Sequence, residues 1–113
     1  ESKVEWIITN LLPLDQVSLE AVAQALDVPP RTLQDRLLKR GLSFQQLLDR
    51  VRMRSARVYM LDTQLSLTEI ADLLGYSQLS ALTRSFKRIM GESPAQWRRK
   101  HKTETLDIAR SVK

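Results

Sequence analysis

The chain of 113 residues contains no cysteine, which excludes disulfide bonds, thiolate metal sites and cysteine nucleophiles. Its single histidine, His101, lies in a basic stretch without a partner carboxylate motif, and no glycine-rich loop of the kind that cradles phosphate is present. None of the usual nucleophile–base pairs can be assembled from these residues. We therefore expect that the protein is not an enzyme and that it holds neither a metal ion nor a cofactor.

Long hydrophobic runs are also missing, since no apolar stretch approaches the roughly 18 residues needed to span a bilayer. No signal-peptide pattern opens the sequence. We expect a protein of the cytoplasm that does not bind membranes. Because the sequence starts with Glu1 rather than Met, we also expect that it is a fragment of a longer protein.

The charge of the chain is unbalanced, with 18 lysines and arginines against 13 acidic residues and a formal net charge of +5. An excess of this sign favours an anionic partner, such as nucleic acid or an acidic membrane surface. A solvated basic surface without any such partner would give the same composition. The charge alone therefore does not decide the function.

The sequence repeats itself with an offset of 48 residues, which grows to 50 residues at the end of the repeat. The segment 18–26 (SLEAVAQAL) is matched by 66–74 (SLTEIADLL). Later pairs are Leu33 with Leu82, Leu37 with Phe86, Gly41 with Gly91, Ser43 with Ser93, and Leu47 with Trp97. A repeat of this length is one supersecondary unit used twice, and the growing offset predicts two small insertions in the second copy.

Each repeat has the pattern of a helix, a tight turn and a second helix, the arrangement that presents a helix to the DNA major groove. Apolar residues recur at helical spacing nearly everywhere, and no β-hairpin signal occurs. We predict an all-α fold of seven helices, in which two helix-turn-helix subdomains are joined by a long central helix. The expected boundaries are 1–42 for the first unit, 43–62 for the linking helix, 66–102 for the second unit and 103–113 for a flexible polar tail.

Residues at the expected helix ends support these boundaries. Predicted N-terminal signals are Ser18, Pro30, the capping box of Ser66 with Glu69, and Ser93 followed by Pro94. Predicted stops are Gly41, Gly75 and Gly91. Ala23 and Ala71 occupy the same place in the two copies, where a small side chain lets two helices approach closely across the turn. Trp6 and Trp97 are expected in the core, and Ile89 on the inner face of its helix.

The second unit resembles the signature of the AraC/XylS family of bacterial transcription regulators. The matching residues are Ile70-Ala71, Leu74-Gly75-Tyr76-Ser77, Ser80, Leu82, Arg84, Phe86-Lys87, Gly91, Ser93-Pro94 and Trp97-Arg98. The first unit matches through Leu19, Ala23, Leu33, Leu37, Gly41, Ser43-Phe44 and Leu47-Leu48, and the resemblance covers about 4–100. It implies a DNA-binding half with two helix-turn-helix units, and a separate N-terminal domain, absent here, that senses a small molecule or mediates dimerisation.

The side chains able to read DNA lie opposite the inner apolar positions of the two expected recognition helices, 30–40 and 78–90. The outward residues are Arg31, Gln34, Asp35 and Leu38 on the first helix, and Leu79, Ser80, Thr83, Arg84 and Lys87 on the second. Arginine pairs with guanine, glutamine pairs with adenine, a carboxylate accepts from the cytosine amino group, and an apolar group can contact the thymine methyl. The resemblance implies base contacts at Arg31, Gln34, Asp35, Leu79, Ser80, Thr83 and Arg84.

Phosphate contacts are expected from the basic residues around these helices. Between Arg84 and Lys102 there are seven lysines and arginines and a single acidic residue. Such a concentration suits the phosphate backbone. The residues expected to contact phosphate are Lys39, Arg40, Lys87, Arg98 and Arg99.

An ordinary solvated helix face is the alternative explanation for each of the base-reading residues. Asp35 stands where the family commonly has a basic residue, and it either reads a cytosine or pairs with Lys39 or Arg31 along the helix. Leu79 either contacts a thymine or packs near the turn. Gln34 either reads an adenine or lies on an ordinary solvated face.

The predicted function is sequence-specific binding of double-stranded DNA by a regulator that activates or represses transcription, with two recognition helices in successive major-groove segments. RNA polymerase subunits are a further possible partner, and an effector or a dimer partner would act only through the absent domain. The alternative is a helical protein-interaction module with a solvated basic face. That module would keep the same apolar positions, but it would not require two matched turns and a basic flank.

Overall fold

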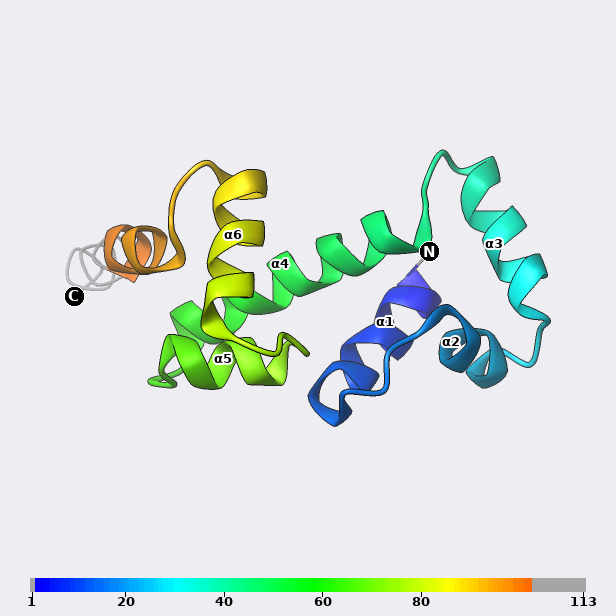
Figure 1. Cartoon of the computed structure of the whole chain (residues 1–113), viewed down its shortest axis with the longest axis horizontal. Coiled ribbons are helices and arrows are strands. Elements are labelled where there is room, and N and C mark those ends of the chain that lie inside the picture. Colours follow the sequence, from blue (N-terminus) through cyan, green and yellow to red (C-terminus); the bar gives the residue numbers. More distant parts are fainter. Residues whose placement is uncertain (1, 103–113) are drawn as a thin grey trace, which may run out of the picture. The chain divides into compact units, whose positions relative to one another are not determined.

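The computed structural model describes residues 2–102, in which every element of regular secondary structure is helical (Figure 1). The elements are α1 (Ser2–Leu11), the 3-10 helix η1 (Leu12–Leu14), α2 (Leu19–Ala25), α3 (Pro30–Lys39), α4 (Phe44–Asp62), α5 (Leu67–Leu73) and α6 (Leu79–Met90), followed by a helix at 94–102. The prediction of an all-α fold with seven α-helices is confirmed within this range. The expected flexible tail, 103–113, lies outside the described residues.

The chain divides into two compact units, and the division falls inside α4 between Ser55 and Ala56. The first unit holds the residues up to Ser55 together with 73–75, and the second holds 56–72 and the residues from 76 onward. The boundaries expected from the sequence follow the repeat instead, with α4 set apart as a linking helix. Among residues 2–102, no helix has both the length and the apolar character that crossing a membrane requires.

The core of the first unit comes from one face of each of its helices. Its buried side chains are Val4, Ile7, Ile8, Leu12, Val22, Ala23, Leu33, Leu37, Leu47, Leu48, Val51, Met53 and Leu74. The spacing of Leu33 and Leu37 in α3 places both on one side of that helix, where each is 1% exposed. The predicted inner face of the first recognition helix is therefore confirmed.

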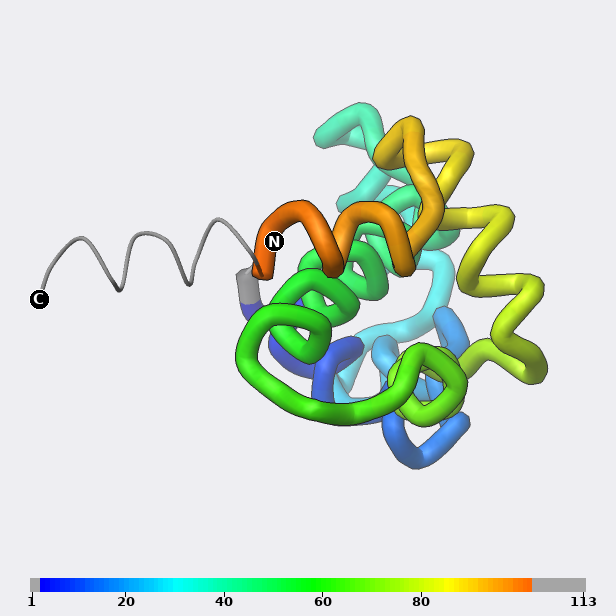
Figure 2. The backbone as a smooth tube through the Cα atoms, turned by 90° about the vertical axis from the view of Figure 1, so that its left-hand side faces the viewer, coloured from blue at the N-terminus to red at the C-terminus, as the bar shows by residue number. Residues whose placement is uncertain are grey.

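The second unit has a smaller core built around two aromatic rings. Phe86 of α6 and Trp97 of the helix 94–102 meet edge to face, with ring centroids 6.0 Å apart. The other buried apolar side chains are Ala56, Met60, Ile70, Ala71, Leu82 and Pro94. Figure 2 follows the chain from α6 (yellow) through a turn into the helix 94–102 (orange). The expectation that Trp97 belongs to the core is confirmed.

The turns of the two helix-turn-helix units share one backbone hydrogen bond. The amide of Val28 donates to Ala23 O at 3.0 Å, and 48 residues later the amide of Tyr76 donates to Ala71 O at the same distance. The residue before each donor has a positive φ, which closes the helix in the Schellman manner. The repeat found in the sequence therefore extends to the backbone geometry of the turns. Ala23 and Ala71, which accept these hydrogen bonds, are both buried.

Most helix ends follow the predicted signals. Ser18 Oγ accepts from the amide of Ala21, and Pro30 is the first residue of α3. Reciprocal capping boxes join Ser43 with Gln46, Ser66 with Glu69, and Ser93 with Gln96. The hydrogen bonds from the backbone and the hydroxyl of Ser66 lower the pKa of Glu69 below its ordinary value. Gly41, Gly75 and Gly91 all have positive φ at helix ends, as predicted.

Two predictions about burial are wrong. Trp6 is 68% exposed, because it lies about 200° around α1 from the buried Val4 and therefore faces away from the core. Ile89 is 42% exposed although it has the helical phase of Leu82, since it lies in the last turn of α6 next to the end of the helix. Helical phase predicts the direction of a side chain but not how far along the helix the core extends.

Candidate nucleic-acid interface

The solvent face of α3 is formed by residues spaced at three and four positions along the helix. Pro29 has an extended backbone with φ −62° and ψ 146°, and Pro30 starts the helix. Burial of Leu33 and Leu37 leaves the opposite side of the helix to water. The exposed residues on that side are Arg31, Gln34, Asp35 and Leu38. The predicted outward face of the first recognition helix is therefore present as an exposed stripe.

The solvent face of α6 is arranged in the same way around the buried Leu82 and Phe86. Ser80, Arg84 and Lys87 are exposed, whereas Leu79 and Thr83 are only partly accessible. Lys87 continues the polar stripe into the last turn of the helix. The seven residues expected to read bases thus divide into five that are fully presented and two that lie at the edge of the face.

Gln78 extends the exposed polar face of α6 beyond the residues expected from the sequence. It precedes α6 as the N-cap residue, and its Oε1 accepts a hydrogen bond from Ser80 Oγ at 3.1 Å. Both side chains are exposed at the start of the helix, where side chains can reach base edges when a recognition helix enters the groove. Gln78 could have been suspected from its place as the first residue of the expected helix 78–90, because the first turn of a recognition helix extends to its N-cap.

The outward faces of α3 and α6 occupy equivalent places in the two repeats. The pairs, each 49 residues apart, are Arg31 with Ser80, Gln34 with Thr83, Asp35 with Arg84, and Leu38 with Lys87. The formal charges cancel on the α3 stripe, whereas the α6 stripe carries two positive charges. Among residues 2–102, no ion pair joins Asp35 to Arg31 or Lys39. The structure thus gives no sign of the intrahelical pairing considered for Asp35.

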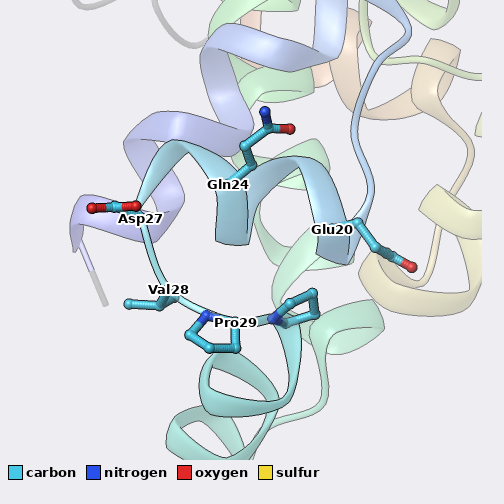
Figure 3. A pocket seen from close by; sticks show the side chains of 6 residues that line it. Glu20, Gln24, Asp27, Val28 and Pro29 are labelled. Atoms are coloured by element: carbon cyan, nitrogen blue, oxygen red, sulfur yellow. The ribbon is translucent and has the colours of Figure 1, made fainter.

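Each helix-turn-helix turn also forms a hollow, but neither hollow suits phosphate. In Figure 3, Glu20 and Gln24 come from α2, while Asp27, Val28 and Pro29 come from the turn; with Pro30 they line a hollow of about 480 Å³. The corresponding hollow of the second unit, about 300 Å³, is lined by Thr68, Glu69, Ala71, Asp72, Tyr76, Ser77, Gln78 and Leu79. Both linings contain carboxylates and no lysine or arginine. Basic side chains that could contact phosphate are therefore found on and after the second helix of each unit.

Four of the five residues expected to contact phosphate are exposed. Lys39 and Arg40 lie at the end of α3, Lys87 lies on α6, and Arg99 lies on the helix 94–102. Cations near a helix C-terminus are also favoured by the helix dipole. These four exposed side chains therefore stay candidates for phosphate contact.

Arg98 is used differently, because its guanidinium binds three backbone carbonyls within the second unit. Nε donates to Met60 O at 3.0 Å, Nη2 to Thr63 O at 2.8 Å, and Nη1 to Leu65 O at 2.5 Å. The side chain satisfies carbonyls at the end of α4 and in the segment that follows. We therefore assign Arg98 to the fold and do not retain it as a phosphate contact.

Lys102 supports the same segment, since its Nζ donates to Thr63 O at 2.9 Å. Arg98 and Lys102, both among the seven basic residues between 84 and 102, thus bind backbone carbonyls. The sequence offers no signal that separates such residues from phosphate ligands, because both kinds of acceptor are oxygens and both favour arginine and lysine.

Comparison with known proteins agrees with this architecture. The family model of the helix-turn-helix domain matches residues 22–100. The HTH-type transcriptional regulator VirS of Mycobacterium tuberculosis is 46% identical over 96 residues, which are 85% of this chain and 28% of VirS. The chain thus spans about a quarter of the length of the curated relatives it matches.

Solved structures show the same fold. The C-terminal domain of AraT, a response regulator from Geobacillus stearothermophilus, matches with a TM-score of 0.75 and 34% identity, over 88% of this chain and 83% of that one. The DNA-binding domain of AdpA, a global transcriptional factor solved in complex with a target DNA, matches with a TM-score of 0.77 and 25% identity, over 91% and 93% of the two chains. The chain therefore belongs to the AraC-type helix-turn-helix DNA-binding domains of transcription regulators.

Proposed function

We propose that this domain binds duplex DNA at specific sequences, with α3 and α6 each entering a major-groove segment, and that it thereby controls transcription. The observation that carries the proposal is the pair of equivalent exposed stripes, each on the second helix of a helix-turn-helix unit. The AdpA domain, which shares the fold and was solved on its target DNA, supports the same use of this architecture.

In the second unit, Arg84 is the principal base-reading residue. It is exposed in the middle of α6, where a bidentate pair with guanine N7 and O6 is the most frequent specific contact of an arginine. Ser80 reads a neighbouring base together with Gln78, and Thr83 and Leu79 contribute from the edge of the face. Lys87 and Arg99 contact phosphates, which fixes the helix in the groove without selecting a sequence.

In the first unit, Arg31 and Gln34 read a guanine and an adenine, and Lys39 and Arg40 contact phosphates at the end of α3. Asp35 accepts a hydrogen bond from a cytosine amino group. A carboxylate at this place is repelled by the phosphates, so the first unit depends more on base contacts than the second. Because the two stripes carry different side chains, the preferred site consists of two unlike half-sites rather than an inverted repeat.

Selection of bound duplexes from a random pool, followed by titration at two salt concentrations, tests the proposal. We expect one preferred site and an affinity for it that exceeds the affinity for random duplex by about 10³-fold or more. Both affinities should fall steeply with salt, because each phosphate contact releases counterions. Equal affinity for selected and random duplexes, or none for either, would instead favour the protein-interaction module.

Functions of a whole regulator go beyond this domain. We propose that RNA polymerase subunits are contacted during transcription control, and that any effector or dimer partner binds to parts of a regulator outside this chain. Since the proposed ligand is DNA, we place the activity in the bacterial cytoplasm. Co-precipitation of purified polymerase on promoter DNA, with and without this domain, tests the first of these proposals: recruitment that does not depend on the domain would reject it.

A further inference from the structure

Leu38 is an apolar residue exposed on the face of α3 that is proposed to enter the groove. It is 61% exposed, whereas its neighbour Leu37 is 1% exposed and belongs to the core. Leu38 follows Gln34 by four positions and Asp35 by three, so these side chains line one stripe of the helix. A leucine in this place is presented to whatever the polar residues of the stripe contact.

Helix termination uses the backbone of Leu38 and not its side chain, which is mostly exposed. α3 ends in a Schellman motif, in which the amide of Leu42 donates to Leu37 O and the amide of Gly41 donates to Leu38 O, both at 2.9 Å. The side chains that this motif usually brings together are those of Leu37 and Leu42. The motif therefore fixes the backbone of Leu38 and leaves its side chain free to face the solvent.

Electrostatics does not explain the α3 stripe either. The equivalent position in α6 is Lys87, and the position equivalent to Asp35 is Arg84, so the second unit carries two cations where the first carries an acid and a leucine. The first unit therefore offers less attraction to phosphate at these two positions than the second unit does. An apolar contact with a base edge requires no charge.

The major groove offers one apolar group on a base edge, the 5-methyl group of thymine. We propose that Leu38 reads a thymine through this methyl group and so determines specificity at one position of the half-site bound by α3. The inference rests on the proposed DNA binding and deepens it, because it names the base that an apolar residue of the first unit selects.

Deoxyuridine provides the test, since uracil lacks the methyl group and keeps every hydrogen-bonding group of thymine. Each thymine of the selected site is replaced in turn, and the affinities of the wild-type chain and of Leu38→Ala are compared. At one position we expect the wild type to lose about three- to tenfold in affinity, which corresponds to the burial of one methyl group and its surroundings. Leu38→Ala should lose nothing at that position, and Leu38→Met, which keeps an apolar contact, should retain the loss.

Leu14→Ala is the matched control, because Leu14 lies in the same unit, is 60% exposed and is not on α3. This variant should show the same loss as the wild type. The inference is overturned if the selected site contains no thymine, if no replacement weakens the wild type, or if Leu38→Ala loses as much as the wild type does. In each of these cases specific binding persists and the proposed function stands. Failure to bind any duplex specifically would overturn both, and the two failures are therefore distinguishable.

Discussion

The two helix-turn-helix units share their inner construction and differ on their outer faces. Leu33 and Leu37 in α3 occupy the places of Leu82 and Phe86 in α6, and all four side chains are buried. The outward residues at equivalent positions differ in every case. Arginine in α3 corresponds to serine in α6, glutamine to threonine, aspartate to arginine, and leucine to lysine. The inner residues hold the helix in place, whereas the outer residues are not constrained by the fold and can differ between the units.

The turns show where the second copy gained its residues. Residues 26–29 separate α2 from α3, and residues 74–78 separate α5 from α6, so one insertion lies in the turn. The other lies toward the end of the second helix. α3 has 10 residues and ends two positions before Gly41, whereas α6 has 12 residues and ends directly before Gly91. Neither insertion alters the hydrogen bond from residue 28 or 76 that closes the first helix.

Truncating one buried side chain in each unit tests whether the inner faces of α3 and α6 are equivalent. These variants have the largest expected effect on stability. Leu33→Ala and Leu82→Ala should each lower the free energy of unfolding by about 2–5 kcal/mol, because both leave a cavity in a packed core. Chemical denaturation measured by circular dichroism gives the two values. If either loss stayed below about 1 kcal/mol, the two helices would not be equivalent in packing.

Arg84→Ala tests the difference between the outer faces. The loss of a bidentate base contact should weaken binding to the selected site by about 1–3 kcal/mol and relax base preference there. Lys87→Ala, on the same helix, is the control: it should weaken all duplexes alike and reduce the salt slope by about one unit. Fluorescence titration of specific and random duplexes measures both, and unchanged selectivity in Arg84→Ala would remove this residue from the reading face.

The residue that closes the first helix distinguishes the two turns. Gly75 has φ +83°, and an added Cβ would lie 3.3 Å from Arg52 Nη2, whereas Asp27 adopts φ +58° at an exposed place. Gly75→Ala should therefore cost about 1–2 kcal/mol of stability. Asp27→Gly should change stability by less than about 0.5 kcal/mol, because relief of the left-handed conformation opposes the gain in freedom of the unfolded chain. Thermal unfolding of both variants measures the two losses of stability. Equal losses in Gly75→Ala and Asp27→Gly would contradict this contrast.

Asp35→Asn sharpens the electrostatic contrast between the two stripes, and its expected effect on binding is smaller than that of Arg84→Ala. Loss of repulsion from phosphate should strengthen binding to random duplex by about 0.5–1 kcal/mol, while discrimination at one base pair falls. Titration of wild type and variant at two salt concentrations is sufficient. If both duplexes bind the variant with unchanged affinity, Asp35 lies away from the DNA and α3 contributes less to sequence reading than α6.

Much of the fold could be predicted from local sequence signals. Apolar periodicity gave the helices and their inner faces, and Ser18, Ser66 and Ser93 cap helices as expected, because capping depends on neighbours within three or four positions. Contacts between distant residues could not be predicted in this way. The carbonyls that bind Arg98 lie 33 to 38 positions earlier in the chain. No sequence signal near Arg98 indicates these partners.

The candidate site shows the same division between local and distant information. The exposed stripe of α3 follows from helical phase, since Leu33 and Leu37 mark its opposite side. Trp6 is exposed because its phase in α1 faces away from Val4, although a tryptophan by its residue type is expected in a core. The hydrogen bond between Gln78 and Ser80 could not be predicted, because it depends on side-chain conformation, which a sequence pattern does not specify.

The constant spacing of 49 residues between the two outward stripes has a consequence for protein engineering. The side chains at 31, 34, 35 and 38 can be transplanted onto 80, 83, 84 and 87 without altering a fully buried position. Such a chimera would carry the same four outward side chains on both helices. Its recognition sequence should therefore change, while its melting temperature stays close to that of the parent. A marked drop in melting temperature would show that the partly accessible position 83 contributes to the scaffold as well as to reading.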